Sequence, residues 1–230
     1  MNDELFDKET ENSLRELLSN LKRKVVNYLV TGENCLSCNE AIALARGMNR
    51  VSNGMVKFEI LDANRDIIEK LMVRYIPGFI YDTKKRNIRF YGIPSGQEFA
   101  PFVYIQKYIG NDELTLPKNI IERVESIEKP LHVKIMVTPE CPYCPLVVDT
   151  LNQIGLVNNQ LLIETIEAVE FPDEANIYNI TYVPSIIVTR IEDWKILGGR
   201  PLEILHGYAD AEIIVKVLEK AYLKLKRMER

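Results

Sequence analysis

Hydrophobic residues in the first part of the chain switch between helical and strand-like spacing. Four leucines, three or four positions apart, predict an amphipathic helix over residues 9–22, and the apolar run at 25–30 predicts a strand. Helical spacing returns from residue 41 to about residue 51, where Ser-Asn-Gly ends the element. A buried strand is expected at 55–61.

The pattern then continues with a helix, a hairpin and another helix. Residues 62–73 have helical spacing, and residues 79–81 and 88–91 flank a turn-rich segment that predicts a β-hairpin. Residues 95–109 predict a long helix. Helices that alternate with strands and end in a hairpin and a helix indicate an α/β sandwich.

The second half of the chain repeats this order, beginning again with a helix and a strand. Its expected elements are, in order, 116–127, 131–137, 147–157, 161–168, 172–178, 185–191, 202–205 and 210–228. Polar residues 111–115, followed by Pro117, form the expected junction. The sequence therefore predicts a tandem duplication, with one domain at 1–115 and the other at 116–230.

Composition and charge narrow the classes of partner. The 230 residues are 47% hydrophobic, which is enough for two domains that each form a core. A net charge of −4 gives no electrostatic footprint for nucleic acid or for an anionic membrane, so we expect neither as a partner. The acidic N-terminus lacks the apolar stretch of a signal peptide, and no later run approaches the roughly 20 residues that span a bilayer. These features predict a soluble, cytoplasmic protein.

All four cysteines occur as Cys-x-x-Cys pairs, each placed between a predicted strand and a predicted helix. The second pair is Cys141 and Cys144, in the sequence CPYCP, and the first is Cys35 and Cys38, in CLSC. A cysteine at the first turn of a helix faces unpaired backbone N–H groups and the positive end of the helix dipole, which lower the pKa of its thiol. Cys141 is therefore the expected nucleophile of its pair, with Cys144 as the resolving thiol.

A structural zinc site is the first alternative, because Cys-x-x-Cys also supplies half of such a site. The two pairs are separated by more than 100 residues, well beyond the roughly 15–20 residues of a zinc ribbon. Two chemically inert pairs would not need the same strand, loop and helix context. We therefore expect working thiols, no bound metal, and disulfides within each pair when the protein is oxidised.

Two prolines lie at matched distances from the two cysteine pairs. Pro77 follows Cys35 by 42 residues and Pro184 follows Cys141 by 43, and each proline opens a predicted strand. An ordinary trans proline at a strand start would explain one such position. Two positions matched to two Cys-x-x-Cys pairs favour a shared role beside the cysteines.

These motifs resemble those of the two-unit protein disulfide oxidoreductases of thermophilic archaea and bacteria, which are glutaredoxin-like relatives of protein disulfide isomerase. The matching stretches are CPYCP at 141–145, EAVEFPDEANIYNITYVP at 167–184 and RFYGIPSGQEF at 89–99. The first site departs from the pattern, because CLSC lacks the Pro-Tyr filling and has a loop one residue longer after Thr31. The resemblance implies two tandem thioredoxin-like folds, each with a central mixed β-sheet flanked by helices.

The same resemblance implies the roles of the remaining site residues. Ile76-Pro77 and Val183-Pro184 would both be cis and would present backbone groups to an extended substrate segment. The substrates would be protein disulfides or dithiols, and a thioredoxin-reductase-like flavoenzyme would supply electrons. The chain itself would need no cofactor. The alternative from a different class is a redox-inert or metal-holding protein that keeps the fold.

Two glutamates are weaker candidates for a role in proton transfer. Glu167 and Glu59 are expected on the strands beneath the two sites, where a carboxylate could accept the proton of a resolving cysteine. An exposed carboxylate at a strand end is the alternative for each, because glutamate is seldom buried.

Overall fold

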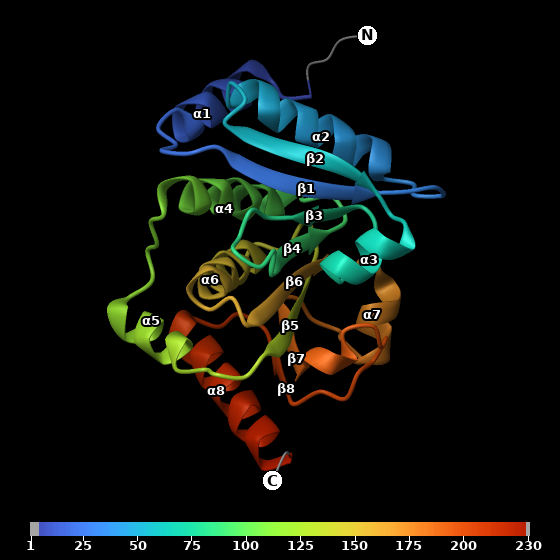
Figure 1. The fold of residues 1–230 in the computed structure, drawn as a ribbon, viewed down its shortest axis with the longest axis vertical. Helices are drawn as coiled ribbons and strands as arrows, with labels where there is room; N and C mark the ends of the chain where they lie inside the picture. The colour runs from blue at the N-terminus through green and yellow to red at the C-terminus, as the bar shows by residue number, and fades with distance from the viewer. Residues whose placement is uncertain (1–4, 229–230) are drawn as a thin grey trace.

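One mixed β-sheet runs through the whole chain. The structure is a computed structural model that describes residues 5–228, and it contains a single eight-stranded sheet in the order β2-β1-β3-β4-β6-β5-β7-β8. Figure 1 shows the two halves of this sheet, one above the other, with helices on both faces. The predicted α/β class is confirmed, and each half has the strand and helix order of a thioredoxin-like fold.

Every predicted helix and strand has a counterpart in the structure. The elements of the first half are α1 (Lys8–Leu18), β1 (Val25–Thr31), α2 (Cys38–Val51), β2 (Val56–Asp62), α3 (Arg65–Leu71), β3 (Gly78–Ile80), β4 (Ile88–Tyr91), the 3-10 helix η1 (Gly96–Glu98) and α4 (Phe99–Asn111). Those of the second half are α5 (Lys118–Glu125), β5 (Leu131–Val137), α6 (Cys144–Val157), β6 (Leu161–Glu167), α7 (Pro172–Ile177), β7 (Ser185–Arg190), the 3-10 helix η2 (Ile191–Asp193), β8 (Glu203–His206) and α8 (Ala211–Met228).

The differences from the predicted boundaries have local causes. Helix α1 ends at Leu18, four residues before the predicted end, although Leu21 still packs into the core from the following loop. Strand β2 extends to Asp62, so α3 begins only at Arg65, where the Asn64 side chain accepts a hydrogen bond from the Ile67 N–H. For α3, the capping residue marks the start of the helix better than the start of the helical spacing does.

The two faces of the sheet carry different helices and different cores. The larger core joins one face to α1, α2, α4, α5, α6 and α8, with Leu29, Phe102 and Leu151 among its fully buried residues. The smaller core joins the other face to α3 and α7 through residues such as Tyr91 and Ile166. Every residue of β5 and β6 is buried because both faces of these central strands are covered.

The two halves are joined through the sheet and through their helices. Strand β4 of the first half pairs in parallel with β6 of the second, with Phe90 opposite Thr165, and α4 packs on α6. The sheet is continuous from one half to the other, so it does not mark where one domain ends. The proposed boundary between residues 115 and 116 therefore stays a prediction. No helix among residues 5–228 is both long enough and apolar enough to cross a membrane.

Buried charges also cross between the halves, in what we call the inter-unit ion cluster. It consists of Arg74, Lys134, Glu164, Glu174 and His132. Arg74 pairs with both glutamates, the Lys134 Nζ lies 2.5 Å from Glu174 Oε1, and His132 Nε2 lies 2.7 Å from Glu164 Oε2. All five side chains are at least 95% buried. The cluster ties the segment that precedes Pro77 to strands β5 and β6 and helix α7.

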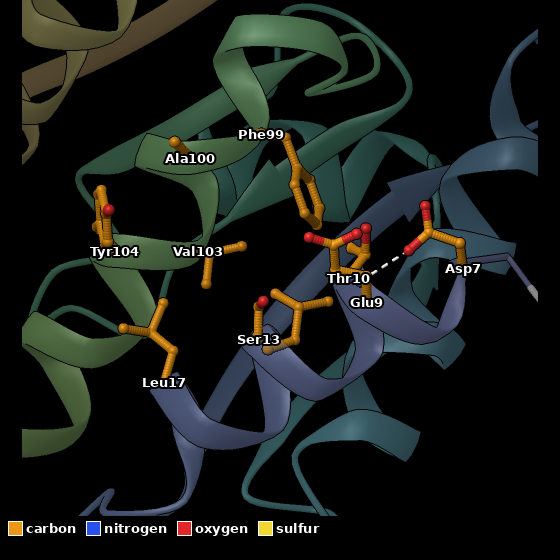
Figure 2. Close-up of a pocket in the computed structure, with 10 residues that line it drawn as sticks. Asp7, Glu9, Thr10, Ser13, Leu17, Phe99, Ala100, Val103 and Tyr104 are labelled. Atoms are coloured by element: carbon orange, nitrogen blue, oxygen red, sulfur yellow. Dashed lines mark hydrogen bonds between the residues drawn. The ribbon is translucent and has the colours of Figure 1, made fainter.

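The apolar stripe of the first helix is largely buried in the core, where α1 packs on α2. Leu14 and Leu18 are buried, and Leu17 lines a groove of about 310 Å³ together with Phe99 and Val103. Figure 2 shows this groove between α1 and α4, with Ser13 and Thr10 along its α1 side. The stripe therefore serves mainly in packing the first half, and what remains open is a narrow groove.

Candidate functional site

The second cysteine pair lies where β5 ends and α6 begins. Cys141 and Cys144 form a disulfide with their Cα atoms 5.5 Å apart. Helix α6 begins at Cys144, so Cys141 precedes the first helical turn, where the sequence analysis had placed it. Pro145 occupies that first turn, where its missing N–H removes no helical hydrogen bond.

The helix terminus nevertheless acts on the Cys141 sulfur. The Cys144 N–H donates a hydrogen bond to Cys141 Sγ over 3.1 Å. Cys141 is 8% exposed, whereas Cys144 is fully buried. A backbone donor at a helix start stabilises negative charge, so Cys141 combines access with a partner suited to its thiolate.

The first cysteine pair has the same placement between β1 and α2. Cys35 and Cys38 form a disulfide with their Cα atoms 5.4 Å apart, and α2 begins at Cys38. Leu36 is fully exposed, and an open pocket of about 420 Å³ is lined by both cysteines, Asp62 and neighbouring residues. This site is therefore more open than the second.

Both prolines lie beside the cysteine loops, and both preceding peptide bonds are cis, which confirms that prediction. Strand pairing places Gly78 opposite Val30 and Ser185 opposite Met136, so each proline stands at the strand end from which a cysteine loop departs. In the described part of the chain, no hydrogen bond uses the backbone groups of Ile76 or Val183. Those groups are available to a bound segment.

The same register corrects the comparison of the two loops. Val30 and Met136 occupy equivalent positions, because each pairs with the residue that follows its cis-proline. Thr31 is therefore equivalent to Val137, and each of these two residues lies four positions before the first cysteine of its pair. The loop of the first site is therefore not longer than that of the second. The sequence suggested a longer loop because its two Val-Thr dipeptides, at residues 30–31 and 137–138, are one position out of register.

The two candidate glutamates differ in environment. Glu167 is 3% exposed and accepts hydrogen bonds from the Val169 and Glu170 N–H groups. These two hydrogen bonds lower the pKa of Glu167, but burial outweighs them and raises it. The nearby charges of Glu170 and Glu140 add to the rise. Its location beside the end of β5 keeps it a candidate for the second site.

Glu59 does not lie in an apolar interior. It is exposed on the edge strand β2 and pairs with Lys57, so the exposed alternative holds for it. The residue of the first half that is equivalent to Glu167 is Asp62, because Thr31 pairs with Asp62 as Val137 pairs with Glu167. Asp62 lines the pocket of the first site and was missed because its equivalence to Glu167 depends on the pairing of β1 with β2, which the sequence pattern does not reveal.

A further carboxyl that the sequence analysis missed is Glu98. It is fully buried in η1, and neither of its oxygens has a hydrogen-bond partner among the described residues. The turn that carries it lies against α6 and against the second cysteine loop, where the Gln97 N–H donates to the Pro139 carbonyl. Its spacing from Phe102, Ile105 and Ile109 places it on the apolar stripe of α4, which is the signal that could have revealed it.

Burial raises the pKa of Glu98 to about 8. A pKa raised in the folded state adds stability below the ordinary value near 4.5, and this stability is lost as the pH rises towards 8. We expect the free energy of unfolding to fall by about 2–4 kcal/mol from pH 5 to pH 9 relative to a Glu98→Gln variant, since each pKa unit is worth about 1.4 kcal/mol. Urea unfolding at several pH values measures this, with Glu9→Gln on the exposed turn of α1 as the control. Parallel pH profiles for wild type and Glu98→Gln would contradict it.

Comparison with known proteins agrees with this architecture. A thioredoxin-domain family model matches residues 131–203. Among solved structures, a protein disulfide oxidoreductase from Aeropyrum pernix has a TM-score of 0.79 at 24% identity, covering 91% of this chain and 90% of that one. The NTD_N/C domain of alkylhydroperoxide reductase AhpF from Enterococcus faecalis has a TM-score of 0.80 at 18% identity, covering 93% and 99%.

Sequence relatives include parts of larger proteins. A component of alkyl hydroperoxide reductase in Pseudomonas aeruginosa is 33% identical over 100 residues, which are 44% of this chain and 19% of the relative. A protein named NADH dehydrogenase from Ferdinandcohnia aciditolerans is 26% identical over 150 residues, which are 63% and 29%. The chain thus spans less than a third of the length of either relative. Residues 131–203 thus match a thioredoxin-domain model, and the chain as a whole has tandem thioredoxin-like folds, each with a disulfide-bonded Cys-x-x-Cys pair.

Proposed function

We propose that the chain catalyses thiol–disulfide exchange on protein substrates, with Cys141 as the main nucleophile and Cys144 as its resolving thiol. The observation that carries the proposal is the disulfide at the start of α6, with a backbone N–H on the more accessible sulfur. Cys35 and Cys38 have the same roles at the first site.

Exchange at the second site proceeds in two balanced steps. The Cys141 thiolate attacks one sulfur of a substrate disulfide, so an S–S bond to Cys141 forms while the substrate bond breaks and one substrate thiolate leaves. The Cys144 thiolate then attacks the Cys141 sulfur and releases the second substrate thiolate. The substrate gains two electrons and, on protonation, two protons, while the chain is left with the Cys141–Cys144 disulfide. Reversal of the steps oxidises a substrate dithiol.

The buried carboxyls Glu167 and Glu98 are the candidates for taking the proton from Cys144. Burial raises the pKa of both carboxyls, and for Glu98 the pKa rises to about 8, so Glu98 can hold a proton near neutral pH. Glu167 is the last residue of β6 and pairs with the last residue of β5, just before the second cysteine loop, and the turn bearing Glu98 contacts that loop from the first half. Asp62 occupies the corresponding position at the first site.

The surface around Cys141 fits an extended protein segment. Exposed apolar and aromatic side chains include Tyr143, Leu146, Tyr182 and Tyr208, and the Tyr143 and Tyr208 rings lie 6.0 Å apart. Aromatic side chains of this kind are common in protein-binding surfaces. The backbone groups of Val183, and of Ile76 at the first site, have no hydrogen-bond partner within residues 5–228 and would bind a substrate backbone in the manner of an added strand.

Electrons for reduction would come from a thioredoxin-reductase-like flavoenzyme. A second candidate function follows from the match to a component of alkyl hydroperoxide reductases, in which the chain would pass electrons to a peroxide-reducing partner. Both functions use the same exchange chemistry. They are separated by whether insulin or a peroxide-reducing partner is reduced faster when the flavoenzyme is supplied.

Reduction of insulin by dithiothreitol tests the proposed function directly. We expect the chain to accelerate precipitation of the insulin chains, and a variant with all four cysteines replaced by serine to have no effect. Measurement of the zinc content of the reduced protein tests the alternative that the chain holds a metal. A chain that binds zinc stoichiometrically and leaves the insulin rate unchanged would contradict the proposal.

We expect Cys141 to react with iodoacetamide before Cys144 in the reduced protein at neutral pH. Cys141 has the greater exposure and accepts the Cys144 N–H, so more of it is present as an accessible thiolate. Mass spectrometry of peptides after short labelling times measures the order. Labelling of Cys144 first would reverse the two roles.

A further inference from the structure

A carboxylate of the second unit reaches into the first cysteine loop. The residue is Glu170, in the turn that follows β6. Its Oε2 accepts a hydrogen bond from the Ser37 hydroxyl over 2.5 Å, and Ser37 lies between the two cysteines of CLSC. Its Oε1 accepts the Ile93 N–H over 2.6 Å. The first redox loop is therefore held by a side chain from the other half of the chain.

The position of Glu170 is built from both halves. The Glu170 N–H donates to Glu167 Oε2 over 2.7 Å, which fixes the turn at the end of β6. Gly92, at φ +92°, leaves room for the carboxylate, because a Cβ there would lie 2.7 Å from Glu170 Oε1. A short turn, a backbone donor and a glycine thus hold the carboxylate against Ser37.

The charge of this carboxylate acts on the redox equilibrium of the first pair. Reduction of the Cys35–Cys38 disulfide by two electrons produces thiols whose ionised form carries negative charge at the start of α2. A carboxylate beside that position repels a thiolate, so it favours the disulfide over the reduced form. The Ser37 hydroxyl donates to the carboxylate and partly neutralises its effect.

We propose that Glu170 is a positioning residue of the first redox site, which holds the CLSC loop from the second unit and biases Cys35–Cys38 towards the disulfide. This deepens the proposed function, because it rests on exchange at that site and assigns the site's redox bias to the other unit. Among the described residues, no hydrogen bond joins Glu170 to Cys141 or Cys144, and its charge acts on that pair only through Glu167, whose backbone donors a side-chain change leaves in place.

Redox equilibration with glutathione, followed by alkylation and peptide mapping, tests the proposal for each pair separately. We expect Glu170→Gln to shift the equilibrium of Cys35–Cys38 about three- to tenfold towards the reduced form, as removal of one nearby charge should. The Cys141–Cys144 equilibrium should change less than about twofold. Ser37→Ala should shift Cys35–Cys38 in the opposite direction, because the carboxylate then loses a neutralising donor.

Glu40→Gln is the matched control, since it removes an exposed carboxylate from the first turn of α2. An equal shift in Glu40→Gln and Glu170→Gln would overturn the proposal by showing a general charge effect. An unchanged Cys35–Cys38 equilibrium in Glu170→Gln would also overturn it. Failure of the proposed function is distinguishable, because neither pair of the wild-type protein would then exchange with glutathione.

Discussion

Cys141→Ser is expected to lower insulin reduction by roughly tenfold or more, whereas Cys35→Ser should leave at least half of it, because attack by the first thiolate starts each exchange. The two sites differ in the residues that lie between their cysteines. Pro142 restrains the second loop, and Tyr143 adds an aromatic surface beside Cys141. Leu36 is fully exposed without such a restraint, and the Ser37 hydroxyl is bound to Glu170. The initial rate of insulin precipitation at equal protein concentration measures the difference.

Serine at either position keeps the size of the side chain, so near-identical circular dichroism spectra are the control for folding. Isomerisation of scrambled ribonuclease should suffer in both variants, because rearrangement needs repeated attack and release. Equal losses of reductase activity in the two variants would show that the units act as one relay. The asymmetry would then have to be abandoned.

The parts of the fold and site that could be predicted from sequence are those set by local pattern. Apolar runs gave the strands, helical spacing gave the helices, and two Cys-x-x-Cys pairs in the same context gave the two sites. The equivalent positions of the two prolines could be predicted because their distances from the cysteines can be counted along the sequence. Pro77 and Pro184 lie at equivalent strand ends, as this spacing predicted.

The parts that could not be predicted depend on how the halves meet. Glu170 touches Ser37 only because β4 and β6 pair in parallel, which no periodicity within one half reveals. Asp62 was missed for a related reason, since its equivalence to Glu167 requires strand register. Glu98 was detectable as a charge on an apolar stripe, but only the packed structure shows that it has no partner among the described residues.

Glu174→Gln is expected to lower the free energy of unfolding by about 3–5 kcal/mol, because removal of one member of a buried ion pair leaves the others uncompensated. Glu174 is fully buried and contacts Arg74, the Lys134 Nζ at 2.5 Å and the Tyr75 hydroxyl at 2.6 Å. Burial alone would raise its pKa, but the charges of Arg74 and Lys134 outweigh burial and lower it. Its contribution is therefore present above the ordinary pKa of 4.5 and is lost on acidification.

Urea unfolding of the oxidised protein at pH 7 measures this loss, and Glu69→Gln provides the matched control. Glu69 also pairs with a lysine, Lys195, but both side chains are about half exposed, so its replacement should cost no more than about 1 kcal/mol. Because Arg74 leads into the loop of Pro77 while Glu174 lies in α7, Glu174→Gln should also speed amide exchange in both segments. Equal destabilisation by the two variants would mean that the inter-unit ion cluster stabilises the fold no more than a surface pair does.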